Sequence, residues 1–221
     1  MRINRYLAQA TGMSRRAADA AVAAGRVAVN GKPAATGQDI GPADTLTLDG
    51  KGITPPAGTC TIILNKPAGY VVSRDGQGSR TIYDLLPAAH HLLKPVGRLD
   101  KESSGLLLLT NDGQLAHDLT HPSRQKVKVY EVELDAPLTP LHRQMVSDHG
   151  IQLSDGPSRF QLERLHEGDD RAWRITMHEG RNRQIRRTFA TLGYATRRLH
   201  RTHFGPYSLQ HLPAGKFHPI P

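Results

Sequence analysis

The chain has little of what disulfide-bonded, zinc-binding or membrane-spanning proteins need. Its 221 residues include one cysteine, Cys60, which excludes an internal disulfide and a thiolate zinc site. We expect Cys60 to be a small buried side chain in a cytoplasmic protein. No apolar run approaches the roughly 20 residues that span a bilayer, and MRINRYLAQATG lacks the apolar centre of a signal peptide. The sequence therefore predicts no membrane partner.

Motifs for nucleotides, cofactors and metals are also missing. There is no GxxxxGK[ST] loop, and no GxGxxG opens a helix after a strand. His178-Glu179 lacks the second histidine that a zinc helix requires, and His90-His91 has no evident co-ligand. We expect neither a cofactor nor a catalytic metal.

Acidic residues are scarcer than basic ones. Lys and Arg total 29 against 20 Asp and Glu, a net charge of +9. This balance favours a polyanionic partner, nucleic acid more than a membrane surface. The hydrophobic share of 38% and charged share of 22% are those of an ordinary globular protein. The length suffices for one sizeable domain and a small one.

Residues 1–50 read as a compact unit of two helices and short strands. Ile3, Leu7 and Ala10 have helical spacing, Gly12 ends that pattern, and Ser14 can cap a second helix. RVAVNGKPA and DTLTLDG alternate as strands do. RINRYLAQATGMSRR…AAGRVAVNGKPA resembles the small RNA-binding domain named after ribosomal protein S-four. Within residues 1–32, six basic residues are accompanied by one acid, Asp19, and predict a phosphate-binding surface: Arg2, Arg5, Arg15, Arg16, Arg26 and Lys32.

Residues 51–59, KGITPPAGT, read as a linker, and a larger domain is expected over 60–221. Strand patterns occur in TIILNK, in GYVVS after a Lys-Pro turn, and in GLLLLTN, VKVYEVEL, RFQLERL and AWRITMH. Helical patterns occur in QLAHDLTH, around PLHRQMVSDHG and in RNRQIRRTFATLGY. Strands with interspersed helices predict an α+β fold with a mixed sheet.

The stretch GRLDKESSGLLLLTNDG joins a charged cluster to an apolar run. Leu106–Leu109 has the length of a central strand buried on both faces. Asp100 lies in the loop that leads into this strand, near Gly97 and Gly105. By itself, Asp100 is more simply interpreted as a turn residue or helix cap, with Arg98 as its surface partner.

Two further stretches place polar groups beside packing residues. In KVKVYEVEL, Tyr130 shares a strand face with Val132 and Leu134. In EGRNRQIRRTFATLG, four arginines crowd the start of a helix, where the helix dipole disfavours cations unless anions are near. Phosphates or a buried carboxylate would compensate them, although a solvated helix surface is also possible. The four are Arg181, Arg183, Arg186 and Arg187.

GRLDKESSGLLLLTNDG, the Lys128-x-Tyr130 strand and GRNRQIRRTF resemble, in the family's order, the three signature regions of RNA pseudouridine synthases. The match is to the ribosomal-RNA group that includes RsuA and RluB, and it covers nearly the whole chain. Two departures are minor. Ser103 stands where the family often has threonine and keeps the hydroxyl, and Thr188 replaces a methionine.

The resemblance implies isomerisation of uridine to pseudouridine in ribosomal RNA, without a cofactor, by a monomer. Large-subunit RNA is favoured over small-subunit RNA, as a structured stem-loop or within a pre-ribosomal particle. Asp100 is then the essential carboxylate, buried and ionised, and Arg186 its positive partner. Tyr130 packs against the target base, and Arg98 enters the gap that the base leaves. Arg181, Arg183 and Arg187 join the RNA-binding surface.

Two other classes of function remain compatible with the sequence. One is a non-catalytic RNA-binding or ribosome-assembly factor that keeps the fold, which loss of Asp100 would have favoured. The other is a metal-dependent nuclease that uses Asp100, Glu102 and Asp112. The nuclease is disfavoured because Asp112 lies beyond the apolar strand.

Overall fold

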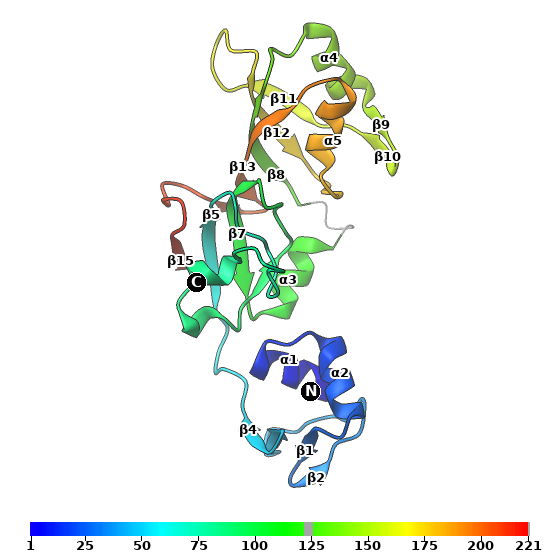
Figure 1. Cartoon of the computed structure of the whole chain (residues 1–221), viewed down its shortest axis with the longest axis vertical. Coiled ribbons are helices and arrows are strands. Elements are labelled where there is room, and N and C mark those ends of the chain that lie inside the picture. The colour runs from blue at the N-terminus through cyan, green and yellow to red at the C-terminus, as the bar shows by residue number, and fades with distance from the viewer. Residues whose placement is uncertain (122–125, 221) are drawn as a thin grey trace. The chain divides into compact units, whose positions relative to one another are not determined.

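The computed structural model describes residues 1–121 and 126–220 (Figure 1). The chain forms two compact units. One comprises Met1–Cys60 with Pro87–Lys94, and the other Thr61–Leu86 with Pro95–Pro221. None of the helices in the described residues is long and apolar enough to cross a membrane.

The first unit contains helices α1 (Ile3–Thr11) and α2 (Arg15–Ala23) and a small antiparallel sheet of order β2-β1-β3-β4. Ser14 caps α2, as predicted, by accepting a hydrogen bond from the backbone N–H of Ala17. Asn30 and Gly31 both have positive φ, as a tight hairpin turn requires. The strands are β1 (Val27–Val29), β2 (Lys32–Pro33), β3 (Leu46–Leu48) and β4 (Lys51–Ile53).

The helices cover this sheet through a small apolar core. Ile3, Leu7 and Val22 are almost fully buried against Val27 and Leu46. Strand β4 occupies the first three residues of the stretch predicted as a linker, where Ile53 pairs with Leu46. Cys60, at the end of this unit, is only partly buried.

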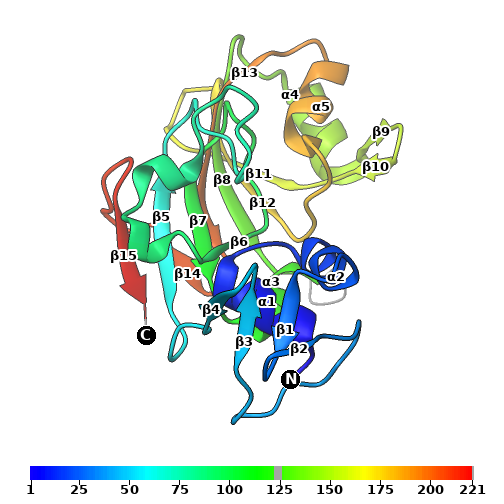
Figure 2. The same ribbon diagram turned by 60° about the horizontal axis from the view of Figure 1, so that its bottom comes forward.

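The second unit is built on a mixed sheet, in agreement with the predicted α+β fold (Figure 2). Its order is β11-β12-β8-β13-β7-β5-β15, with β14 on β13 and β6 on β7. The pair β13/β7 is parallel, whereas the other pairs along this order are antiparallel. The strands are β5 (Thr61–Lys66), β6 (Lys94–Val96), β7 (Ser104–Thr110), β8 (Lys128–Leu134), β11 (Gln161–Arg164), β12 (Ala172–Met177), β13 (Thr196–Phe204), β14 (Tyr207–Ser208) and β15 (Phe217–Ile220).

Helices and one hairpin complete the described part of the chain. Helix α5 and the β9–β10 hairpin lie side by side in both views (Figures 1 and 2). The hairpin strands are β9 (Ile151–Leu153) and β10 (Gly156–Ser158). The helices are α3 (Gly113–Thr120), α4 (Pro140–Gln144) with a π turn (Met145–His149), and α5 (Gln184–Thr191), with 3-10 turns at Ile82–Leu85 and Ala88–His90.

The leucine run is the centre of the second unit. Strand β7 lies between β13 and β5, and Leu106–Leu109 are inaccessible to solvent, as predicted. A strand covered on both faces fixes whatever loop precedes it, because its register cannot slip without exposing these side chains.

One predicted strand is absent from the described residues, and several strands of the structure were not predicted: β6, β9, β10, β13, β14 and β15. GYVVS was expected to be a strand, but Val71 makes a single bridge to Thr81. Conversely, β13 was not predicted, because TRRLHRTHF has no apolar alternation. Its buried Arg201 is accommodated by a hydrogen bond of 2.8 Å from Nε to the carbonyl of Leu106.

Gly105, at the start of β7, adopts a φ of +107° against the backbone of β13. A Cβ here would lie 2.2 Å from the carbonyl oxygen of Arg201 and 2.5 Å from its nitrogen. We expect Gly105→Ala to lower the free energy of unfolding by about 3 kcal/mol or more, since both atoms belong to a central strand. Urea denaturation measures this.

Gly113→Ala is the matched control. Gly113 begins α3, and a Cβ there meets nothing within 4 Å. This variant should be neutral or more stable by up to about 1 kcal/mol. Equal stability of the two variants would show that the β7–β13 contact can relax.

Candidate active site

The candidate site is the turn Asp100–Ser103, between β6 and β7. Its carboxylate is partly accessible, because the side chain of Asp100 is 30% exposed. This corrects the expectation of a buried Asp100. Leu99 is buried, whereas Arg98 is exposed. Within residues 1–121 and 126–220, the guanidinium of Arg98 makes no hydrogen bond or ion pair, which leaves that group free for a ligand.

One side of the turn is held by Lys66, at the end of β5. Lys66 is completely buried, and its ammonium donates to the carbonyls of Asp100 at 3.1 Å and Ser103 at 2.7 Å. It also reaches the carbonyls of Lys101 at 3.4 Å and Pro67 at 3.0 Å. We call these four acceptors the carbonyl cage. It ties the turn to β5.

The other side of the turn is held by two arginines of the α5 region. Arg183 Nη1 lies 2.9 Å from Glu102 Oε2 and 3.6 Å from Asp100 Oδ2. Arg186 Nη2 donates to the carbonyl of Glu102 and to Ser103 Oγ, both at 3.3 Å. Arg186 Nη1 also donates to the carbonyl of Thr196 at 3.0 Å, which links the turn to β13.

These contacts change the proton affinities around the turn. Burial lowers the pKa of Lys66 to about 8, although the charges of Asp100 and Glu102 act to raise it. The hydrogen bond from Arg183 lowers the pKa of Glu102. Burial, and then the charge of Arg183, lowers the pKa of Arg186. The carboxylates of the turn thus lie close to several positive side chains, which also lie close to one another.

The ion pair with Asp100 therefore differs from the predicted one. The expected partner was Arg186, but the pair in the structure is with Arg183. Arg186 binds the backbone of the turn and the hydroxyl of Ser103 instead. Arg186 and Asp100 are close enough for their charges to interact. That Arg186 assists Asp100 in the reaction stays a prediction.

Tyr130 lies on β8 in line with the start of β7. It pairs with Arg201 of β13, which pairs with Gly105. Two strand spacings, about 10 Å, thus separate Tyr130 from Gly105. Tyr130 is 8% exposed and packs on the same strand as the buried Val132 and Leu134, as predicted. Its role towards a base stays a prediction.

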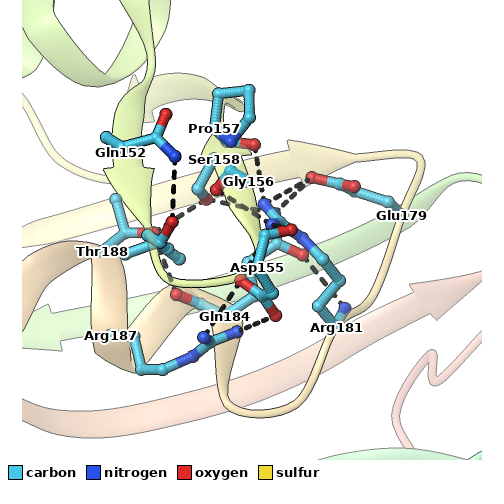
Figure 3. Close-up of polar contacts among 11 residues, drawn as sticks. Gln152, Asp155, Gly156, Pro157, Ser158, Glu179, Arg181, Gln184, Arg187 and Thr188 are labelled. Carbon is cyan, nitrogen blue, oxygen red and sulfur yellow. Dashed lines mark hydrogen bonds and ion pairs between the residues drawn. The ribbon is translucent and has the colours of Figure 1, made fainter.

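The remaining arginines of this region have carboxylate partners within the chain. Arg181 Nη1 lies 2.9 Å from Asp155 Oδ1, and Arg187 Nη2 lies 2.7 Å from Asp155 Oδ2 (Figure 3). Arginines at the start of α5 were expected to need anions, and the structure supplies Asp155, Glu102 and Glu179. RNA phosphate is not required for this compensation.

The predicted RNA-binding residues of the first unit fall into two groups. Arg2 pairs with Asp39 at 3.7 Å and Arg26 with Asp49 at 2.6 Å, while Arg15 donates to Asn4 Oδ1 at 3.3 Å. The other three are exposed, and their side chains make no hydrogen bond or ion pair in the described part of the chain: Arg5, Arg16 and Lys32.

Sequence reasoning missed Lys66 and Asp155. Lys66 follows the apolar run Thr61–Leu64, and a charged residue that extends a fully buried strand was the available signal. Asp155 lies in a hairpin turn, where aspartate is ordinary. Glu102 was considered only as a metal ligand. Among residues 1–121 and 126–220, no three His, Cys, Asp or Glu side chains cluster as a metal site. Asp112 instead caps α3.

Comparisons with known proteins agree with this architecture. Residues 61–191 match the family model of RNA pseudouridylate synthase, and residues 1–46 match the S4 domain. A crystal structure of a pseudouridylate synthase superimposes with a TM-score of 0.72 at 31% identity, covering 100% of this chain and 96% of that one. The chain therefore belongs to the RNA pseudouridine synthase family, which confirms the resemblance inferred from its sequence.

Two relatives show how far the similarity extends. A Xanthomonas campestris protein named ribosomal large subunit pseudouridine synthase B is 38% identical over 226 residues, or 94% of this chain. The match spans only 44% of that relative's length. An Aquifex aeolicus protein named uncharacterized RNA pseudouridine synthase is 36% identical, covering 98% of this chain and 89% of the relative.

Proposed function

We propose that this chain converts a uridine of ribosomal RNA into pseudouridine, and that the RNA belongs to the large subunit. The observation that carries the proposal is an accessible carboxylate, Asp100, on a turn whose backbone is fixed from two sides. This turn lies inside the residues matched to the family model. The name of the Xanthomonas relative supports large-subunit RNA. That the chain acts as a cytoplasmic monomer stays a prediction from the sequence.

In this proposal Asp100 acts on the sugar of the target nucleotide. It either attacks the anomeric carbon of the ribose or removes a sugar proton to help the uracil leave. Both routes need an ionised carboxylate at a fixed place. Arg183 Nη1, at 3.6 Å, places a positive charge beside this carboxylate. Arg186 adds a second positive charge while it holds the backbone of the turn.

Tyr130 and Arg98 would handle the base. A uridine must leave its stack before its sugar can react, at a cost of a few kcal/mol. Arg98 is exposed two residues before Asp100, and its planar guanidinium suits stacking in the vacated gap. Tyr130 would pack against the uracil ring. We assign it stacking rather than proton transfer, since a free tyrosine has a pKa of about 10.

Residues 1–50 would supply a phosphate-binding surface, joined by residues 51–59 to the catalytic residues 60–221. Affinity for RNA falls as salt rises, and each phosphate contact adds about 0.7 to 0.9 to the steepness of log affinity against log salt concentration. We expect Arg16→Gln to make this dependence less steep by that amount. Arg26→Gln is the control, because Arg26 already pairs with Asp49. Equal slopes for wild type and Arg16→Gln would remove Arg16 from the RNA surface. Titrations at several salt concentrations measure this.

Mapping pseudouridines across ribosomal RNA, with and without this gene, tests the proposal. We expect one large-subunit position to lose its pseudouridine and regain it when the wild-type gene returns. If a small-subunit pseudouridine is lost instead, the chain catalyses the proposed reaction but its substrate is small-subunit RNA. An unchanged map would instead favour a non-catalytic RNA-binding factor.

A further inference from the structure

The turn of the β9–β10 hairpin carries a carboxylate that is engaged by two arginines. Asp155 accepts hydrogen bonds from both terminal nitrogens of Arg187, at 3.1 Å and 2.7 Å, in a bidentate pair (Figure 3). The same carboxylate accepts Arg181 Nη1 at 2.9 Å. Such paired geometry is directional and stronger than a single contact. We call these three residues the Asp155 clamp.

Arg181 also binds the backbone of the hairpin. Nη1 donates to the carbonyls of Asp155 at 2.8 Å and Gly156 at 3.0 Å, and Nη2 to that of Pro157 at 2.7 Å. Nε of Arg181 and Nε of Arg187 are buried. Arg181 thus directs its terminal nitrogens at the hairpin, and Arg187 directs one N–H of each terminal nitrogen at Asp155.

A buried polar network joins the same hairpin to α5. Ser158 Oγ accepts from Gln184 Nε2 at 3.0 Å and from Thr188 Oγ1 at 2.8 Å. All three residues are at most 3% exposed. Glu179 accepts from Arg181 and from Gln184. The start of α5 is therefore attached to the hairpin by its charged surface and by its buried side chains.

Residues between these attachments reach the turn that carries Asp100. Arg183 has a φ of +47°, in the left-handed region, immediately before α5. It pairs with Asp100 and Glu102, while Arg186 binds the backbone at Glu102. Arg183 and Arg186 carry like charges that repel each other, so a fixed helix start is needed to hold both against one turn.

We propose that Asp155 is a positioning residue for the reaction: its clamp on Arg181 and Arg187 fixes the start of α5 so that Arg183 and Arg186 hold the turn of Asp100. The inference rests on the proposed function. It reassigns Arg181 and Arg187 from RNA binding to support of the site.

The test compares Asp155→Ala with Asp148→Ala, which removes the same charge from an exposed site in the π turn. For Asp155→Ala we expect kcat to fall about 10- to 100-fold, with RNA affinity unchanged within about twofold. Asp155→Glu should recover part of kcat, because the charge returns. Asp148→Ala should match wild type. An unchanged kcat, or a fall in kcat explained by weaker RNA binding, overturns the proposal.

Arg187→Gln gives a second test that does not depend on Asp155→Ala folding. If Arg187 belongs to the clamp, this variant loses kcat but keeps the wild-type salt slope. A slope lower by about 0.7 to 0.9 would mean that Arg187 contacts phosphate, and the proposal fails. Wild-type isomerase activity is measured first. Its absence would overturn the proposed function, whereas an active wild type with an equally active Asp155→Ala overturns only the clamp.

Discussion

Asp100→Asn should slow pseudouridine formation by about 10³-fold or more while RNA binding stays within about threefold. Asparagine keeps the shape of the side chain but has no negative charge. It can neither attack the ribose nor accept a sugar proton. The turn itself should persist, because Lys66 and Arg186 bind its carbonyls. Single-turnover assays on ribosomal RNA, with a parallel binding assay, measure the two quantities.

Asp112→Asn is the matched control for this prediction. Asp112 accepts from the backbone N–H groups of Gln114 at 2.8 Å and Leu115 at 3.2 Å, and asparagine caps helices equally well. We expect full activity. An equal loss of activity in Asp112→Asn would show that the effect of Asp100→Asn is not specific to Asp100. Retained isomerase activity in Asp100→Asn would remove Asp100 from the chemistry.

Lys66→Met should lower kcat by about 100-fold or more without touching the RNA surface. Methionine has a similar length but no donor, so the carbonyl cage loses its cation and the turn can shift by the fraction of an ångström that matters for Asp100. Each buried carbonyl left without a partner costs about 1 to 3 kcal/mol. Circular dichroism checks that the fold remains. Lys101→Met, on the exposed surface of the same turn, is the control and should retain most activity.

The pH dependence of the wild type offers an independent check on Lys66. Its pKa of about 8 lies below the ordinary value of 10.5, so the folded chain binds this proton less tightly than the unfolded chain. Burying the ammonium therefore costs stability below about pH 8, and that cost fades between about pH 8 and 10.5. Over this interval the amine loses one of three donor hydrogens.

We therefore expect opposite trends above about pH 8. Wild-type kcat should fall as the cage loses a hydrogen bond, while the free energy of unfolding rises relative to Lys66→Met. Rate profiles and urea denaturation at about pH 7 and pH 9.5 compare the two. A kcat that stays flat across this range would show that the cage works equally well with a neutral amine.

Sequence patterns predicted the parts of the fold that local chemistry determines. The cap at Ser14 and the buried strand at Leu106–Leu109 were found because each depends on residues close together in the chain. Asp100 was placed correctly in the loop before β7 for the same reason. Its importance came from resemblance to a family, since an aspartate in a turn is common.

The remainder depends on contacts between distant residues. Lys66 meets Ser103 across 37 positions, and no local pattern marks a lysine whose acceptors are backbone carbonyls. Strand β13 is central although it is rich in arginine and histidine, because its neighbours β7 and β8 supply the partners. Arg183, rather than Arg186, meets Asp100 because the backbone turns at a positive φ just before α5.

The carbonyl cage also has a consequence for how such a chain can diverge. Lys66 recognises only backbone oxygens of the turn, which every amino acid provides. Side chains on the outer surface of the turn, such as Lys101, are then free to change without moving the reactive carboxylate. A mutational scan of position 101 should therefore find wide tolerance in reaction rate, and differences in which RNA sequence around the uridine is accepted. The chemistry and the choice of substrate can be inherited separately.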